Sequence, residues 1–495
     1  MPALSGAPVL PLLGHASQDD LLDVCRRAAR AAQRQQRPVL ASWATRLRHA
    51  DPIALWSHGR AQTDRSLLWH SAWDRGSLVA LGTAHDLTAH GDSRIPATRT
   101  SWERLVRDAV TGSHPGDGLP TGQGPLLVGG FSFAAAADTA ATAGETRTAP
   151  FPEALMWVPA LQMRGSTSLS PMAELRLNAV IHPGDDPEQT AKSLVHLAEQ
   201  CLPEGAAPHS QDALRSASRK PLAFRELPAA EQWKGMVGQA VDRIRAGAFE
   251  KVVLAREVQV TTGMPFDLPM ALERLRRTYP DATVFAVGHG AHTFIGATPE
   301  YLVRLSGTSV HALGLAGTAP RGSTARLDTE LEKQLTDSAK IRHEHDVVVR
   351  MLVNALRPTC AHVEAGNGPT VLKLANVQHL ATVVEGRGVQ PGLGILHFVE
   401  RLHPTPALGG HPREASLNWL KQNEGLERGW YAGTIGWTDA SGQGEFAVAI
   451  RCALVRDSTA SLYAGCGIVA DSDPEEEYEE TLVKLRPMLQ ALGVE

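Results

Sequence analysis

The feature that most limits the fold of this sequence is a group of short apolar runs, bounded by glycines, in its second half. A strand signal over 251–260 is followed by four more such runs, at 282–288, 292–297, 300–307 and 308–317. Runs of this kind, separated by glycine-containing turns, are typical of antiparallel hairpins. Because strands are grouped apart from helices, the pattern favours an α+β fold over a doubly wound parallel sheet.

Helical patterns lie on both sides of these strands. Apolar residues recur at helical spacing over 233–244, and Gly247 is the expected stop of that helix. A long helix is predicted over 327–356, and a final helix over 474–492. Three further strands are expected before the final helix, near 433–437, 445–455 and 461–469.

The first two hundred residues carry fewer signals. An amphipathic helix is predicted over 19–34 and a strand over 126–133, but no group of reactive side chains stands out. The polar stretch 202–224 is broken by proline and glycine and is the expected boundary between two parts of the chain.

Composition excludes several classes of protein. A chain of 495 residues with 43% hydrophobic and 20% charged residues is typical of a soluble globular protein. The net charge of −5 argues against a nucleic-acid binder, and no apolar run approaches the roughly 18 residues that span a membrane. The N-terminus lacks the basic segment of a signal peptide, and the five cysteines are widely spaced. We therefore expect a cytoplasmic protein.

Two single residues are candidates for proton transfer. Lys251 begins a predicted strand; it is either a surface lysine or a partly desolvated amine whose lowered pKa makes it a base. Glu300 lies between two predicted strands, as a solvated turn residue or as a carboxyl that Gly296 and Pro299 direct into a cleft. The local sequence leaves both alternatives open.

One carboxylate of the long predicted helix is a candidate metal ligand. The run His343-Glu344-His345 does not suit zinc, because adjacent helical residues point about 100° apart and zinc-binding histidines need i, i+4 spacing. Charged helix residues usually face solvent. The alternative is that Glu344 alone contributes to a hard cation such as Mg²⁺.

The final predicted helix begins in a densely acidic segment, 471–480. Several of these acids are explained by helix capping, with Pro474 in the first turn and glutamates complementing the helix dipole. Glu477, Glu480 and Lys484, however, fall on one face at i, i+3 and i+7. Crowded carboxylates suit a divalent cation, and Lys484 suits an anionic group of a substrate.

Two further features suit an anion. Arg451 interrupts an apolar strand, and a buried arginine needs an anionic partner. The glycine-containing segment 464–469 offers backbone N–H groups with no side chain in the way.

Nine phrases of the second half, in this order, resemble the chorismate-utilising enzymes: FEKVVLARE, IGATPE, LAGTAPRG, KIRHEH, VQHLAT, LHPTPALGG, GEFAVAIRCALV, YAGCGIV and EEYEETLVKL. The resemblance covers roughly 228–495. It implies an α+β fold like that of anthranilate synthase component I, with two packed β-sheets and helices outside. It also implies that residues 1–224 are the variable N-terminal region of this fold and that 225–495 form the chorismate-binding catalytic domain.

The resemblance assigns chemical roles to the candidate residues. Lys251 corresponds to the general base that activates water to attack C2 of chorismate, and Glu300 to the general acid that protonates the departing C4 hydroxyl. Glu344 and Glu480 correspond to the Mg²⁺ ligands, with Glu477 nearby.

The remaining assignments concern substrate binding. Arg451 and the amide of Gly465 correspond to groups that bind the enolpyruvyl carboxylate, and Lys484 to one that helps hold the anionic substrate. Gly317 and His379 match positions that line the pocket.

One position departs from the family pattern. The family usually carries an acid three residues before Glu344, where this chain has Ile341, so a water-mediated contact to the metal is expected to be missing.

Within the family the chain is most similar to isochorismate synthases, isomerases that use water and Mg²⁺. LHPTPALGGHP and RGWYAGTIGW resemble the menaquinone-pathway enzymes more than the siderophore-pathway ones. The rivals are a siderophore-pathway isochorismate synthase, a salicylate synthase, which also eliminates pyruvate, and a chorismate-binding regulatory protein. Lys251 argues against anthranilate synthase, so no glutaminase subunit is expected. The joint presence of a base and an acid argues against a regulatory protein.

Overall fold

The structure is a computed structural model, and it describes residues 13–48, 50–114, 117, 124–135, 150–165, 172–202 and 220–494. Most of the predicted boundary stretch 202–224 lies outside the described residues. None of the described helices is both long enough and apolar enough to cross a membrane.

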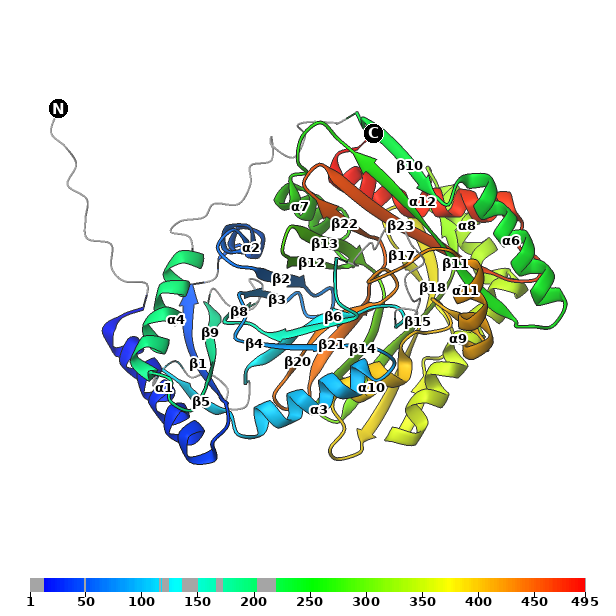
Figure 1. Ribbon diagram of the computed structural model, residues 1–495. Helices are drawn as coiled ribbons and strands as arrows, with labels where there is room; N and C mark the ends of the chain where they lie inside the picture. The colour runs from blue at the N-terminus through cyan, green and yellow to red at the C-terminus, as the bar shows by residue number, and fades with distance from the viewer. Residues whose placement is uncertain are drawn as a thin grey trace, which may run out of the picture.

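Two large, mainly antiparallel sheets form the centre of the molecule (Figure 1). In order across the first sheet, its strands are β10 (Ala223–Leu227), β11 (Lys251–Thr261), β23 (Thr459–Ile468), β22 (Cys452–Arg456), β13 (His292–Thr298), β12 (Thr283–His289), β2 (Arg65–His70), β3 (Ser77–Leu81), β8 (Leu161–Gly165), β9 (Met172–Ile181), β1 (Val39–Arg48) and β5 (Val110–Ser113), with the short β19 (Gly410–His411) beside β11. In the second sheet they are β16 (Cys360–Ala365), β18 (Val377–Val389), β15 (Ser309–Pro320), β14 (Tyr301–Ser306), β21 (Gly444–Val448), β20 (Thr434–Asp439), β6 (Leu126–Phe131), β7 (Ala154–Val158) and β4 (His85–Ala89), with β17 (Thr370–Lys373) beside β18.

The described helices pack on the outer faces of this sandwich. They are α1 (His15–Gln35), α2 (Pro52–Arg60), α3 (Arg94–Arg107), α4 (Pro187–Cys201), α6 (Ala230–Arg245), α7 (Leu268–Thr278), α8 (Ala325–Asp337), α9 (Ala339–Leu356), α10 (Ile395–Leu402), α11 (Arg413–Asn423) and α12 (Pro474–Leu492), with a 3-10 turn at Arg357–Thr359. Figure 1 shows α3 and α10 side by side next to the second sheet, where α3 contacts β4 and β7 and α10 contacts β14 and β21. The predicted α+β fold of two packed sheets is confirmed.

One hydrophobic core fills the space between the sheets. Trp69 and Phe285 of the first sheet belong to the same buried cluster as Phe131 and Phe446 of the second. A second cluster lies on the outer face of the first sheet, where α1, α2, α4, α7 and α12 cover it. Burial of this apolar area is the main force that holds the two sheets and the helices together.

Strands from both parts of the chain build both sheets. In the first sheet β12 pairs with β2, and in the second sheet β20 pairs with β6. The two sides of the predicted division at 224/225 therefore share their sheets and the core between them.

The helix predicted over 327–356 is wrong as a single helix. The chain forms α8 and α9, separated at Ser338, whose backbone is extended. The Ser338 side chain accepts a hydrogen bond from the backbone N–H of Ile341 and so caps the second helix. The helix predicted from residue 19 also begins earlier, at His15.

The strand predicted over 445–455 is also wrong as a single strand. It is divided into β21 and β22, and these two strands belong to different sheets. The chain crosses between the sheets at Ala449–Arg451, where Arg451 has φ 51°, in the left-handed region. The other predicted helices and strands of the second half are confirmed, and α12 spans the predicted 474–492.

Candidate active site

All ten residues that the sequence nominated line one cavity of about 320 Å³, the active-site cavity. They are Lys251, Glu300, Gly317, Glu344, His379, Arg451, Gly465, Glu477, Glu480 and Lys484. The cavity lies where strands β11, β15 and β23 approach helices α9 and α12. Sequence positions more than two hundred residues apart thus meet at one place, and their roles can be considered together.

Lys251 and Glu344 form one wall of this cavity. Lys251 is the first residue of β11 and Glu344 lies on α9; Nζ and Oε1 are 2.5 Å apart. The lysine side chain is only 6% exposed, so its ammonium group is largely shielded from water. Gly467 of β23 makes room for the pair, because a Cβ at that position would lie 2.6 Å from Cε of Lys251.

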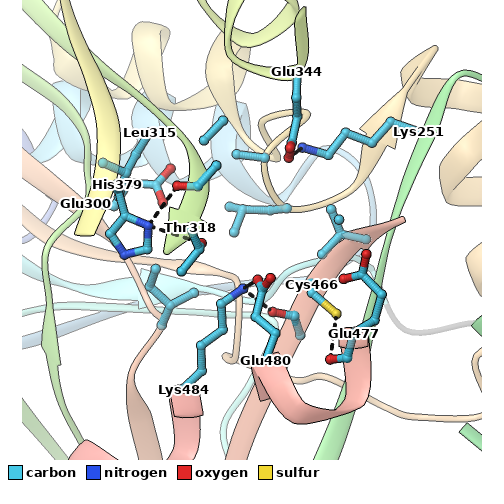
Figure 2. A pocket seen from close by; sticks show the side chains of 18 of the residues that line it. Lys251, Glu300, Leu315, Thr318, Glu344, His379, Cys466, Glu477, Glu480 and Lys484 are labelled. Carbon is cyan, nitrogen blue, oxygen red and sulfur yellow. Dashed lines mark hydrogen bonds and ion pairs between the residues drawn. The ribbon is translucent and has the colours of Figure 1, made fainter. Parts of the chain in front are cut away.

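Glu300 enters the cavity from the other side (Figure 2). It lies where the chain crosses from β13 in the first sheet to β14 in the second, and it is 4% exposed. Burial raises the pKa of Glu300 to about 8, although the positive charges of Arg451, Lys251 and Lys484 act in the opposite direction. At neutral pH this carboxyl is therefore mainly protonated and can donate a proton.

Arg451 lies at the second crossing between the sheets. Its carbonyl accepts a hydrogen bond from Ala297 N–H at 3.1 Å, which fixes the left-handed backbone conformation beside Glu300. Non-glycine residues in this conformation are uncommon and often mark functional sites. Burial lowers the pKa of Arg451, and the nearby Tyr431, Glu480 and Glu300 act in the opposite direction.

His379 is held as a neutral ring. Burial, and then the charges of Arg451 and Lys484, lower the pKa of His379 to about 3. Its Nδ1 lies 3.1 Å from the Gly317 carbonyl oxygen, so Nδ1 carries the proton and donates it. Nε2 is then an acceptor, and Arg451 Nη2 approaches it at 3.4 Å. Gly317 has φ 77°, and a Cβ there would overlap the Ile341 side chain, so only glycine fits this bend in β15.

A second lysine–glutamate pair lies on the opposite wall. Lys484 Nζ and Glu480 Oε1, one turn apart on α12, are 2.5 Å apart, and the same Nζ donates to the Gly465 carbonyl oxygen at 2.9 Å. Glu477 accepts a hydrogen bond from Ser472 Oγ at 2.6 Å. Burial and the charge of Glu480 raise the pKa of Glu477. Figure 2 shows the Lys484–Glu480 pair and the Lys251–Glu344 pair facing each other across the cavity.

The carboxylates of the cavity provide some, but not all, of the ligands that a hard cation needs. Across the described segments of the chain, no three histidine, cysteine or carboxylate side chains gather closely enough to form a complete metal site. Glu344 and Glu480 nevertheless line the same cavity. Magnesium usually takes one or two protein carboxylates and completes its shell with substrate oxygens and water. The donor set therefore fits Mg²⁺ held jointly with an anionic substrate.

Sequence reasoning named no role for Tyr431, which lines the cavity beside Gly465. Its hydroxyl lies 3.0 Å from the place where a Gly465 Cβ would be, and its ring stacks on Tyr463 with centroids 5.2 Å apart. Burial raises the pKa of Tyr431, so its hydroxyl stays protonated. Leu315, Ile450 and Leu408 give the cavity its apolar surface. The phrases RGWYAGTIGW and LHPTPALGG, which contain Tyr431 and Leu408, were the available signal.

Known proteins similar to this chain give one consistent picture. Residues 26–493 match the family described as Chorismate binding enzyme. The chain is 34% identical over 471 residues to the isochorismate synthase MenF of Bacillus subtilis, which covers 94% of this chain and 96% of that relative. It is 35% identical over 478 residues to the salicylate biosynthesis isochorismate synthase of Pseudomonas aeruginosa, with 94% and 93% covered. The solved structure of MenF, the menaquinone-specific isochorismate synthase of Escherichia coli, has a similar fold, with a TM-score of 0.74, 21% identity and 96% and 100% covered.

Proposed function

The chain belongs to the chorismate-binding enzymes, and on that premise we propose that it is an isochorismate synthase, an isomerase that converts chorismate to isochorismate. Two full-length relatives whose names state this activity support the proposal. The same reaction needs a base and an acid on opposite faces of one ring, together with groups that bind two carboxylates. Each of these has a candidate in the active-site cavity.

The placement of Lys251 and Glu300 is the observation that carries the proposal. The two side chains enter the cavity from opposite sides, as Figure 2 shows. Glu300 is protonated near neutral pH because burial raises its pKa to about 8. A buried protonated carboxyl facing an amine is the arrangement expected for an acid–base pair acting across a substrate.

The proposed reaction replaces the hydroxyl group at C4 with a hydroxyl group at C2 that comes from water, and the atoms balance. Lys251 takes a proton from water as the water oxygen bonds to C2 of chorismate. The ring double bonds shift, the C4–O bond breaks, and Glu300 gives its proton to the departing oxygen, which leaves as water. Lys251 can accept this proton only as a neutral amine, so its ion pair with Glu344 must break and its ammonium group must first release a proton to solvent.

Positive groups of the cavity hold the substrate. Arg451 is planar, permanently charged and directed into the cavity, so it suits a carboxylate such as the enolpyruvyl group. Lys484 adds a second positive charge on the α12 wall. His379, being neutral, can orient Arg451 through Nε2 without competing for the anion.

We propose Mg²⁺ as the cofactor, with Glu344 and Glu480 as its protein ligands and Glu477 close to them. When bound, Mg²⁺ neutralises the ring carboxylate next to the reacting carbon. The two carboxylates line the cavity from opposite walls, and each is paired with a lysine in the protein alone.

Menaquinone biosynthesis is the pathway we propose, in the cytoplasm, where five free cysteines are compatible with a reducing environment. Its support is the near full-length match to the Bacillus subtilis MenF. The Pseudomonas aeruginosa relative makes salicylate biosynthesis the second candidate. Loss of menaquinone after deletion of the gene in the source organism distinguishes the two pathways, because a salicylate enzyme would leave menaquinone unchanged.

A single assay tests the activity. Purified protein is incubated with chorismate and Mg²⁺, and isochorismate, salicylate, pyruvate and anthranilate are resolved by liquid chromatography. The proposal expects isochorismate and no stoichiometric pyruvate. Salicylate with pyruvate would indicate a salicylate synthase, and unconsumed chorismate would indicate a binding protein.

A further inference from the structure

A second cavity lies behind the Lys251–Glu344 pair. This rear cavity has a volume of about 540 Å³ and is formed by the connection from α6 to β11, the first half of α9, and the segments around His411 and Val469. Its wall combines apolar side chains such as Phe249 and Val347 with the polar groups of Glu250 and His411.

The rear cavity and the active-site cavity share two lining residues, Lys251 and Glu344. The two cavities therefore meet at these residues, and we call their ion pair, with Nζ and Oε1 2.5 Å apart, the partition. The rear cavity opens to solvent, because Ala248 and Glu250 on its lining are exposed. The rear cavity thus connects the protein surface with Lys251 and Glu344, two residues that also line the substrate site.

The proposed reaction needs water at this wall. The nucleophile must reach the face of the ring beside Lys251, whereas the departing oxygen leaves beside Glu300 on the opposite side. A bound small molecule usually has 70–90% or more of its surface buried, so chorismate itself obstructs the active-site cavity. Water that approaches from the substrate side would have to pass the ligand, whereas water in the rear cavity is already next to the base.

We propose that the rear cavity is the route by which the nucleophilic water reaches Lys251 while chorismate fills the active-site cavity. Polar groups on its wall, including His411 and Glu250, give such water the hydrogen-bond partners that it needs. Movement of Glu344 away from Lys251 opens the partition and frees the amine in the same step. This inference rests on the proposed function.

The structure provides a matched pair of positions for the test. Ala248 and Ala246 are exposed alanines two residues apart in the same connection, but only Ala248 lines the rear cavity. Ala248→Trp narrows the cavity, and Ala246→Trp adds the same side chain beside it. Ala470→Leu narrows the cavity from the opposite segment, and it guards against an indole ring that turns outward in the Ala248→Trp variant.

Steady-state kinetics with chorismate, and the thermal midpoint, are measured for each variant. We expect Ala248→Trp and Ala470→Leu to lower kcat by about tenfold with an unchanged KM, and Ala246→Trp to match the parent. An unchanged kcat in both cavity variants would overturn the route, as would a loss seen only in KM, which would indicate a disturbed substrate site. If the parent protein itself makes no isochorismate, the proposed function has failed, and this outcome is distinct from failure of the water route.

Discussion

Lys251 and Glu344 neutralise each other at the boundary of two cavities, with Nζ 2.5 Å from Oε1. The resemblance assigned these residues separate roles, Lys251 as a base and Glu344 as a metal ligand. In the protein alone, however, the two side chains form an ion pair with each other. The lysine side chain is only 6% exposed, and Glu344 provides it with a partner of opposite charge inside the protein. The ion pair also means that the proposed base cannot act until the glutamate has found another partner.

Lys251→Ala should abolish turnover and leave the fold intact. General-base catalysis is typically worth ~10²–10⁴-fold in rate. The measurement is the rate of isochorismate formation, with circular dichroism as the check on folding. The matched control is Lys421→Ala, which removes an exposed lysine of α11. A Lys251→Ala protein with near-parental activity would remove this residue from the mechanism.

Glu300→Gln tests the acid and its ionisation together. The pKa of Glu300 is raised to about 8, so the carboxyl is protonated below that pH and becomes an anion above it. A general acid is active in its protonated form, and kcat/KM of the parent should therefore fall as the pH rises through about 8. The glutamine variant should lose most activity, and its residual activity should lack this alkaline decline. An alkaline decline that persists in Glu300→Gln must come from another group.

Gly467→Ala tests how closely the partition is packed. The added Cβ would lie 2.6 Å from Cε of Lys251 and 3.1 Å from Oε1 of Glu344, so the pair must shift. We expect a large loss of kcat without loss of the fold. Gly235→Ala in α6 is the control, because no atom lies within 4 Å of its added Cβ, and it should keep full activity. Parental kcat in Gly467→Ala would show that the position of Lys251 is not critical.

Glu480→Gln should raise the Mg²⁺ concentration needed for half-maximal activity. The reason is that Glu480 is one of two carboxylates proposed to share the cation, whereas its neighbour Glu479 is exposed and lies outside the cavity. Mg²⁺ binding is also followed by calorimetry in the presence of chorismate, which reports on the site without turnover. EDTA should stop the parent reaction and Mg²⁺ restore it. Equal effects of Glu480→Gln and Glu479→Gln would argue against this ligand.

Much of the fold, and the identity of the residues that line the active-site cavity, could be predicted from the sequence. Glycine-bounded apolar runs predicted the hairpins of the second half, and proline and acidic residues located α12 correctly. The ten nominated residues all line one cavity. They could be nominated together because the resemblance matched them to family motifs, whereas local sequence patterns gave no such information. Glu300 illustrates the difference: a carboxylate after a proline looks like a turn residue until the sheets on either side bury it.

The features that were wrong or missing depend on long-range or backbone geometry. Ser338 is of a residue type that favours a helix N-cap and was the local signal for the division between α8 and α9, but the apolar spacing continues across it. Arg451 adopts a left-handed conformation that its residue type does not favour, and this bend sends β21 and β22 into different sheets. The pairing of β2 and β6 with strands hundreds of residues away, and the rear cavity, arise only once the chain has folded.

The most direct test of the whole account is the reaction of chorismate and Mg²⁺ in water enriched in oxygen-18, with the product examined by mass spectrometry and NMR. We expect isochorismate with one labelled oxygen at C2, no stoichiometric pyruvate in a lactate dehydrogenase assay, and no labelled product from Lys251→Ala. An unlabelled product would show that solvent water is not the nucleophile. Pyruvate released at the rate of chorismate consumption would instead make the protein a salicylate synthase.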